Sequence, residues 1–325
     1  MKTSMTIAGI LLGLSLPALP TNPAIRSIPI PGSRAFPESI TSTSNGTLFI
    51  GRIGDGGIVR VKPRTGESSI FVQPGAYGSR SILGLFADEP SNTLWACSNN
   101  LSALGGVATG SDTRSALKAF DLTTGAGKLS VSLPGPQAFC NDIAMDAEGS
   151  LYLTDSANPT ILKLFHDATT FEVFAQDPIF SAPEADKAGL DGIAFGSDGN
   201  LYVTTYAVGR LIRISVKGGK AGRITVLSGT RSLVLPDALR NLGNDTFLLV
   251  EESGTLDRLE IRGDTFALAP NHSGFATPTS VTQVGATAWV SEGNTLYFFD
   301  PSKRAQKPPL PFRIYAILLT KDDTK

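Results

Sequence analysis

Residues 191–205 read DGIAFGSDGNLYVTT, and residues 141–155 read NDIAMDAEGSLYLTD. Each stretch has a short apolar run, a tight turn containing Gly, and a second run of β-branched and aromatic residues. This order predicts two antiparallel strands joined by a hairpin. Because the same shape occurs twice at an interval typical of structural repeats, it predicts a repeated β unit.

Four further copies of the hairpin occur, and they begin at Glu38, Leu83, Asp237 and Thr279. The six copies start roughly 42 to 58 residues apart, as expected when one four-stranded blade is repeated around an axis. After residue 205, the runs RLIRISV and GRITVLS supply a third and a fourth strand. We therefore predict an all-β fold, a six-bladed β-propeller with four-stranded antiparallel blades.

The domain organisation follows from the repeat. A closed repeat array can fill most of the 325 residues, so residues 21–325 are predicted to form a single propeller domain. The strand-like segments AIRSIPIPG near the N-terminus and FRIYAILL near the C-terminus both suit the last blade. Either one could supply its outer strand, because propellers protect their last sheet edge with strands from the chain ends.

The N-terminal residues differ from the repeat. Lys2 is followed by an apolar stretch over residues 5–19 that is short for a membrane span. We interpret residues 1–20 as a signal peptide rather than a buried strand, and expect a secreted or periplasmic protein without a membrane span after signal removal.

Charge and cysteine content restrict the partners. Lys and Arg total 28 against 29 for Asp and Glu, and no basic run occurs, so nucleic acid is excluded as an expected partner. A small-molecule substrate and a monomer are expected. Cys97 and Cys140 are the only cysteines and are predicted to lie on neighbouring blades, where a disulfide and two free buried thiols are both compatible with the sequence.

Oxygen donors stand at the first position of four of the six hairpins: Glu38, Asn141, Asp191 and Asp237. The inner strands of a propeller start at one face around the axis, so these side chains should meet in space. Carboxylate and amide oxygens suit Ca²⁺, with Mg²⁺, Mn²⁺ or Zn²⁺ as alternatives. Asn-Asp and Asp-Gly are also ordinary turn formers, whereas Glu has no comparable turn preference.

The ends of the second strands could form a pocket wall around this site. The candidates there are Arg52, Asn99, Asp155, Tyr206 and Glu252, of which we select Arg52, Asn99 and Tyr206, together with Asn141, as substrate-binding residues. The two histidines, His166 and His272, are not expected at the channel mouth, which disfavours a Ser-His-Asp triad.

The segments FPESI, FCNDIAMDAEGSLYLTD and LDGIAFGSDGNLYVTTY resemble the family of gluconolactonases, senescence marker protein (regucalcin) and luciferin-regenerating enzyme. The resemblance implies a six-bladed propeller with one catalytic divalent metal at the top of the channel. It implies that Glu38, Asn141, Asp191 and Asp237 are metal ligands, and that Asn141 also contacts substrate or bound water. Asp191 stands where the family often has Asn.

The resemblance also implies a reaction, the hydrolysis of a sugar lactone or another small cyclic ester. The metal would polarise the carbonyl, and a carboxylate would act as general base; Asp237 is the first candidate and Asp191 the second. Two alternatives remain open. One is a non-catalytic binding propeller with a structural calcium, and the other is a strictosidine-synthase-like enzyme.

Overall fold

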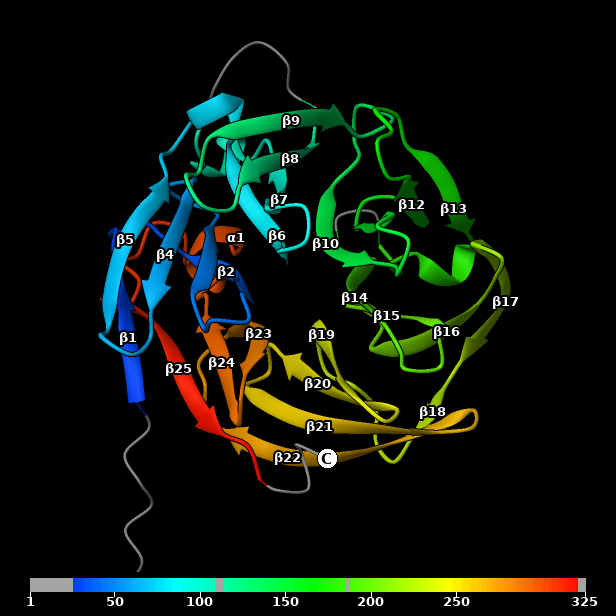
Figure 1. Ribbon diagram of the computed structural model, residues 1–325. Coiled ribbons are helices and arrows are strands. Elements are labelled where there is room, and N and C mark those ends of the chain that lie inside the picture. Colours follow the sequence, from blue (N-terminus) through cyan, green and yellow to red (C-terminus); the bar gives the residue numbers. More distant parts are fainter. Residues whose placement is uncertain (1–25, 109–113, 185–186, 321–325) are drawn as a thin grey trace, which may run out of the picture.

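The computed structural model describes residues 26–108, 114–184 and 187–320, so the predicted signal peptide lies outside the described residues. Figure 1 shows six sheets arranged in sequence order around a central axis. The predicted six-bladed propeller is confirmed. In the described ranges, no helix is long and apolar enough to cross a membrane.

Each blade is numbered by its sequence order, and its strands run from the axis outward. Blade 1 consists of β2 (Pro37–Ser42), β3 (Leu48–Arg52), β4 (Ile58–Lys62) and β5 (Glu67–Val72). Blade 2 consists of β6 (Ser81–Asp88), β7 (Thr93–Asn99), β8 (Ala116–Asp121) and β9 (Gly127–Ser132). Blade 3 consists of β10 (Cys140–Met145), β11 (Leu151–Asp155), β12 (Thr160–Leu164) and β13 (Glu172–Gln176).

The second half of the ring repeats this pattern. Blade 4 consists of β14 (Leu190–Phe195), β15 (Leu201–Thr205), β16 (Arg210–Lys217) and β17 (Lys220–Val226). Blade 5 consists of β19 (Pro236–Gly243), β20 (Thr246–Glu251), β21 (Thr255–Arg262) and β22 (Thr265–Ser273), with the two-residue β18 (Ser228–Gly229) added at its edge. Blade 6 consists of β23 (Pro278–Val284), β24 (Thr287–Glu292), β25 (Phe312–Leu318) and β1 (Arg26–Ile30).

Both ends of the chain close the ring. The C-terminal β25 is the third strand of blade 6, and the N-terminal β1 pairs with it antiparallel as the outer strand, so that the two lie side by side in Figure 1. The N-terminal candidate for the outer strand was thus correct, and the C-terminal candidate was wrong. Because strands from opposite ends of the sequence share one sheet, opening the ring would break the β1–β25 hydrogen bonds.

The hydrophobic core lies between adjacent blades. One cluster joins Tyr152 and Ile161 of blade 3 to Leu201, Val203 and Ile212 of blade 4. These strands place alternate residues on opposite faces, so each sheet buries an apolar layer against both neighbours.

The end of the ring where inner strands begin is called the top face below. All the short helical turns that the structure describes lie in connections on this face. They are η1 (Ala76–Gly78), η2 (Ser102–Leu104), η3 (Pro178–Phe180) and α1 (Leu296–Phe299).

Candidate metal and catalytic site

Every inner strand begins with an irregularity. The register against the second strand shifts between Pro37 and Ile40, and comparable shifts occur at the start of all the other inner strands. A bulge redirects the side chains within it. The four predicted donors Glu38, Asn141, Asp191 and Asp237 lie inside these shifts, and all four are buried.

Three of these donors are carboxyl groups that influence one another. The pKa values of Glu38, Asp191 and Asp237 are raised well above their usual range, first by burial and then by the charges of neighbouring carboxylates. Asp191 and Asp237 also influence the pKa values of each other. Acidic side chains from blades 1, 4 and 5 therefore lie near enough to influence one another where the inner strands begin.

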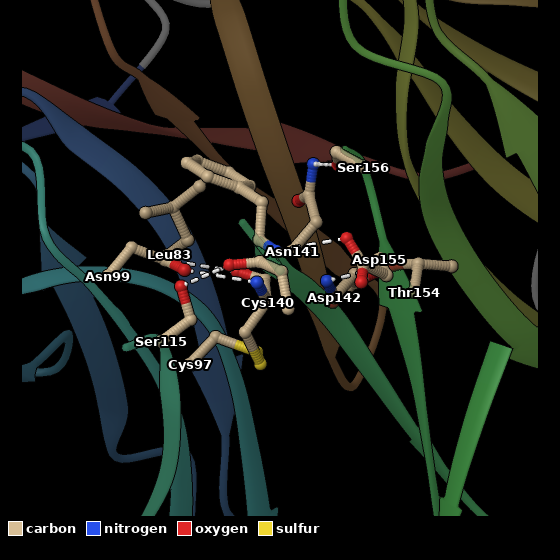
Figure 2. The surroundings of a disulfide bond; sticks show 12 residues. Leu83, Cys97, Asn99, Ser115, Cys140, Asn141, Asp142, Thr154, Asp155 and Ser156 are labelled. Carbon is tan, nitrogen blue, oxygen red and sulfur yellow. Dashed lines mark hydrogen bonds between the residues drawn. A yellow bond between two sulfur atoms is a disulfide. The ribbon is translucent and has the colours of Figure 1, made fainter. Parts of the chain in front are cut away.

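Asn141 joins this group through its amide. Its Nδ2 donates to Ser156 Oγ at 2.8 Å, and Ser156 Oγ donates to the Leu190 carbonyl at 2.6 Å, so blade 3 is tied to the start of blade 4. Figure 2 shows Asn141 and Ser156 facing each other across the bond. The amide also interacts with the Asp191 carboxylate and favours its charged form.

Hydroxyl groups on second strands hold the backbone of the site. Thr154 Oγ1 donates to the Asp191 carbonyl at 2.6 Å, and Thr204 Oγ1 donates to the Asp237 carbonyl at 3.2 Å. Ser291 Oγ donates to the Glu38 carbonyl at 3.3 Å. Blades 3, 4 and 6 thus help to position the donor of the next blade, although sequence analysis did not assign these residues a role.

Tyr206 and Glu252 extend the acidic site toward the top face. The hydroxyl groups of Tyr206 and Thr295 both donate to the Glu252 carboxylate. The charge of Glu252 raises the pKa values of Glu38, Asp191 and Asp237, which places it beside the cluster. Of the proposed pocket-wall residues, these two belong to the cluster.

The other pocket-wall residues contact backbone. Arg52 donates to the Pro31 carbonyl at 3.3 Å and lies 3.7 Å from the Asp55 carboxylate. Asn99 exchanges two hydrogen bonds with the backbone of Cys140, at 2.7 and 3.0 Å, and Asp155 accepts from Phe139 N at 2.9 Å. Figure 2 shows Asn99 and Asp155 on either side of the strand that carries Asn141. Substrate contact by Arg52 and Asn99 stays a prediction.

A buried ion pair that sequence analysis missed lies beside the cluster. Arg240 donates to both carboxylate oxygens of Asp142, at 2.6 and 3.0 Å, and Ile193 N donates to Asp142 at 3.2 Å. The pair borders a small cavity of about 10 Å³, which Glu38 and Asp237 also line. One signal was available: the second position of the other five hairpins carries only Ser, Gly or Ala, whereas this hairpin has Asp142.

A disulfide fastens the strand that carries Asn141. Cys140, the preceding residue, is bonded to Cys97 at the end of β7, with their Cα atoms 5.2 Å apart (Figure 2). Of the two alternatives compatible with the sequence, the disulfide is the one observed.

The donor chemistry of the site fits a divalent cation. Within residues 26–108, 114–184 and 187–320, no three His, Cys, Asp or Glu side chains are gathered tightly enough to hold a metal ion. However, Asp191 Oδ1 is buried without a hydrogen-bond partner, and the surrounding donors are carboxylate and amide oxygens. A hard cation would satisfy this oxygen and offset the repulsion among the acids.

The sequence of the central blades matches a known family model. The match spans residues 123–233, and the model describes the SMP-30/Gluconolactonase/LRE-like region. This region includes Asn141 and Asp191, whereas Glu38 and Asp237 lie outside it.

Solved structures share the fold at low sequence identity. The allergen Mala s 1 of Malassezia sympodialis has a TM-score of 0.68 at 16% identity, over 90% of this chain and 95% of the allergen. A gluconolactonase from Xanthomonas campestris has a TM-score of 0.61 at 14% identity, over 87% of this chain and 88% of that enzyme. Virginiamycin B lyase from Staphylococcus aureus has a TM-score of 0.59 at 14% identity, over 91% of this chain and 99% of the lyase. No curated protein sequence matches the chain.

Proposed function

We propose that the protein is a metal-dependent hydrolase that opens a sugar lactone or another small cyclic ester. The observation that carries this proposal is the meeting of buried acids from blades 1, 4 and 5 beside Asn141 of blade 3. The family match over residues 123–233 and the likeness to the X. campestris gluconolactonase support the same reaction class.

The proposed roles follow from the donor set. Glu38, Asn141, Asp191 and Asp237 would hold one divalent cation, Ca²⁺ first among the candidates. When bound, such a cation supplies a Lewis acid that polarises an ester carbonyl and acidifies water. Asp237 would accept the proton of the attacking water, with Asp191 as the second candidate for that role. Asn141 would orient the substrate through its amide.

A lyase reaction dependent on histidine has less support. The S. aureus lyase is inactive when one histidine is replaced by alanine. In this chain, His166 is largely exposed beyond β12, and His272 lies on the outer strand β22 against Phe275. Neither belongs to an inner strand.

The proposal is tested with a panel of lactones. Purified protein is treated with a chelator and assayed after addition of Ca²⁺, Mg²⁺, Mn²⁺ or Zn²⁺, alongside Glu38→Gln and Asp237→Asn. Asp198→Asn is the matched control, because Asp198 lies in the β14–β15 turn at the opposite end of blade 4. We expect activity to require a metal and both site acids, but not Asp198. Hydrolysis that survives chelation and both site substitutions would refute the mechanism.

We also propose export to an oxidising compartment, secreted or periplasmic, with residues 1–20 as the signal. The Cys97–Cys140 disulfide supports this location, because such bonds persist where thiols are not kept reduced. The mass of the mature protein recovered outside the cytoplasm tests the proposal. A full-length protein retained with the cytoplasmic fraction would contradict it.

A further inference from the structure

Exposed apolar side chains border the top face beside the acidic cluster. Val208 lies in the β15–β16 turn, Val234 and Leu235 precede β19, and Leu296 and Phe299 belong to α1. Their exposed fractions range from 36% for Val208 to 50% for Val234. Three separate connections, from blades 4, 5 and 6, thus contribute to what we call the apolar rim: Val208, Val234, Leu235, Leu296 and Phe299.

Hydrogen bonds bring these connections together at Glu252. The carboxylate of Glu252 accepts from Tyr206, two residues before Val208, and from Thr295, the residue before Leu296. The backbone N–H of Glu252 donates to the Leu235 carbonyl at 2.9 Å. Because Glu252 also acts electrostatically on Asp191 and Asp237, the apolar rim adjoins the proposed catalytic groups.

Turn packing supports the same arrangement. A side chain added at Gly209, next to Val208, would collide with the Leu233 carbonyl, its Cβ lying 2.2 Å from that oxygen. The β15–β16 turn therefore lies directly against the segment that leads to Val234 and Leu235.

The segment before β19 is held rigidly. The carboxylate of Glu251 accepts from Val234 N and from Arg231, whose Nη1 lies 3.0 Å from Oε1. Leu235 has a φ of 52°, a left-handed conformation that is costly for a residue with a branched side chain. Phe36, at the equivalent position of blade 1, has a similar φ of 44° but is fully buried. The left-handed conformation is thus shared by two blades, whereas the 38% exposure of this side chain is particular to Leu235.

The cavity at the cluster is small. Its volume of about 10 Å³ is far below the 300–1,000 Å³ typical of sites that enclose a whole drug-sized ligand. A substrate whose reacting ester reached the acids would therefore leave its substituent on the top face. The four carboxyl groups of Glu38, Asp191, Asp237 and Glu252 outnumber the two charges of a bound divalent cation, so an anionic substituent is disfavoured there.

We propose that the apolar rim binds the substituent of the substrate, and that the substrate is a neutral cyclic ester with an alkyl or aromatic side chain rather than a polyhydroxylated sugar lactone. This inference rests on the proposed hydrolase function and narrows its substrate class. Val234, Leu235 and Leu296 are the specificity-determining residues.

The test compares γ-lactones that carry alkyl chains of increasing length with glucono-δ-lactone, in the protein loaded with its activating metal. Each methylene placed on the rim should raise kcat/KM by about three- to fourfold, mainly through KM. In Leu235→Asn and Leu296→Ser, this increase per methylene should become markedly smaller. Asn tolerates the left-handed conformation of residue 235, so that variant is expected to fold.

Leu318→Ser is the matched control, because Leu318 is 75% exposed at the end of β25 and lies away from Glu252. Its chain-length dependence should equal that of the unmodified protein. A preference for glucono-δ-lactone, or an equal chain-length dependence in all variants, would overturn the apolar rim while leaving the hydrolase intact.

A binding measurement separates the two proposals. Calorimetric titration with alkyl-substituted γ-lactams, which resist hydrolysis, measures the affinity of the apolar rim for an alkyl chain without any reaction. Affinity that rises with chain length and falls in Leu235→Asn supports the rim, even if every lactone is left intact and the hydrolase proposal fails. Lactam affinity independent of chain length would reject the rim.

Discussion

Blades 1, 3, 4 and 5 differ from blades 2 and 6 in what stands at the first position of the inner strand. In the first group this residue is an acid or an amide, whereas blade 2 has Leu83 and blade 6 has Thr279. Leu83 packs in the core, and Thr279 Oγ1 donates to the Pro37 carbonyl at 3.1 Å. The register shift is common to all six inner strands, so the bulge belongs to the propeller, and the side chain that it carries distinguishes the two groups of blades.

The two groups also differ on the top face. The longest connections between second and third strands belong to blade 2, over residues 100–115, and to blade 6, over residues 293–311, which includes α1. Blade 6 therefore contributes Thr295 and Leu296 to the top face although its inner strand has no carboxylate. Blades 4 and 5 thus carry both proposed catalytic acids and residues of the apolar rim, whereas blade 6 contributes rim residues without a carboxylate at the start of its inner strand.

The largest effect is expected from removing one acid. Asp237→Asn should lower kcat for lactone hydrolysis by about 10²- to 10⁴-fold, because the amide cannot accept the proton of the attacking water. Leu83→Met, at the same position of blade 2, should keep kcat close to that of the unmodified protein, since this swap conserves volume. Steady-state kinetics measure both. Equal losses of kcat in the two variants would show that the acid at this position has no particular catalytic role.

The next effect concerns stability at the junction of blades 2 and 3. Replacing Cys97 and Cys140 together with Ala should lower the free energy of unfolding by about 2–4 kcal/mol, because the unfolded chain loses a cross-link. Denaturant titration of the double variant measures this change. An unaltered midpoint and slope would show that the blade contacts suffice without the bond.

The pH dependence of stability should distinguish the acid-bearing blades. The fold raises the pKa values of Glu38, Asp191 and Asp237, so it favours their neutral forms. Their stabilising contribution is complete below the pKa values of the unfolded chain, which are about 4, and is lost as the pH rises through the raised pKa values of the folded protein. The loss amounts to about 1.4 kcal/mol for each tenfold difference in proton affinity between the folded and unfolded states.

Metal-free protein should therefore become less stable between about pH 4 and neutrality, and Asp191→Asn should reduce that loss. Added Ca²⁺ should restore stability at neutral pH. Thermal denaturation across this pH range, with and without the metal, measures both effects. Stability that rises with pH in the metal-free protein would contradict the mutual repulsion of these acids.

The smallest effect is expected from the hydroxyl groups that hold the backbone. Thr204→Val should cost about 1 kcal/mol of stability and also lower kcat, because the Asp237 carbonyl loses its donor. Thr282→Val, which removes a 2.8 Å contact with Ser42 toward the other end of blade 6, should cost similar stability without lowering kcat. A matching fall in kcat for both variants would mean that Thr204 has no particular positioning role.

Much of the candidate site could be predicted because it repeats. Glu38, Asn141, Asp191 and Asp237 occupy one position of a periodic pattern, and symmetry brings equivalent positions together. Asp142 and Arg240 could not be paired in this way. They occupy different positions of two hairpins, and they belong to blades 3 and 5, which are not neighbours in the ring. Their contact therefore depends on how the inner strands pack around the axis.

The contacts of the pocket-wall residues could not be predicted from the repeat either. Arg52, Asn99, Tyr206 and Glu252 all follow or end second strands, so the repeat treats them alike. The structure directs Arg52 and Asn99 to backbone carbonyls and joins Tyr206 to Glu252. Individual loop conformations decide among these outcomes, and those conformations are not periodic.

By itself, the sequence determined the number of blades, the strand order within a blade and which residues face the axis, because alternation and turn chemistry are local properties. Only the tertiary structure decided that β1 is the outer strand of blade 6, that Cys97 reaches Cys140, and that Glu252 joins the connections of three blades. These features depend on contacts between residues far apart in the chain, whose partners are chosen when the ring closes and its blades pack.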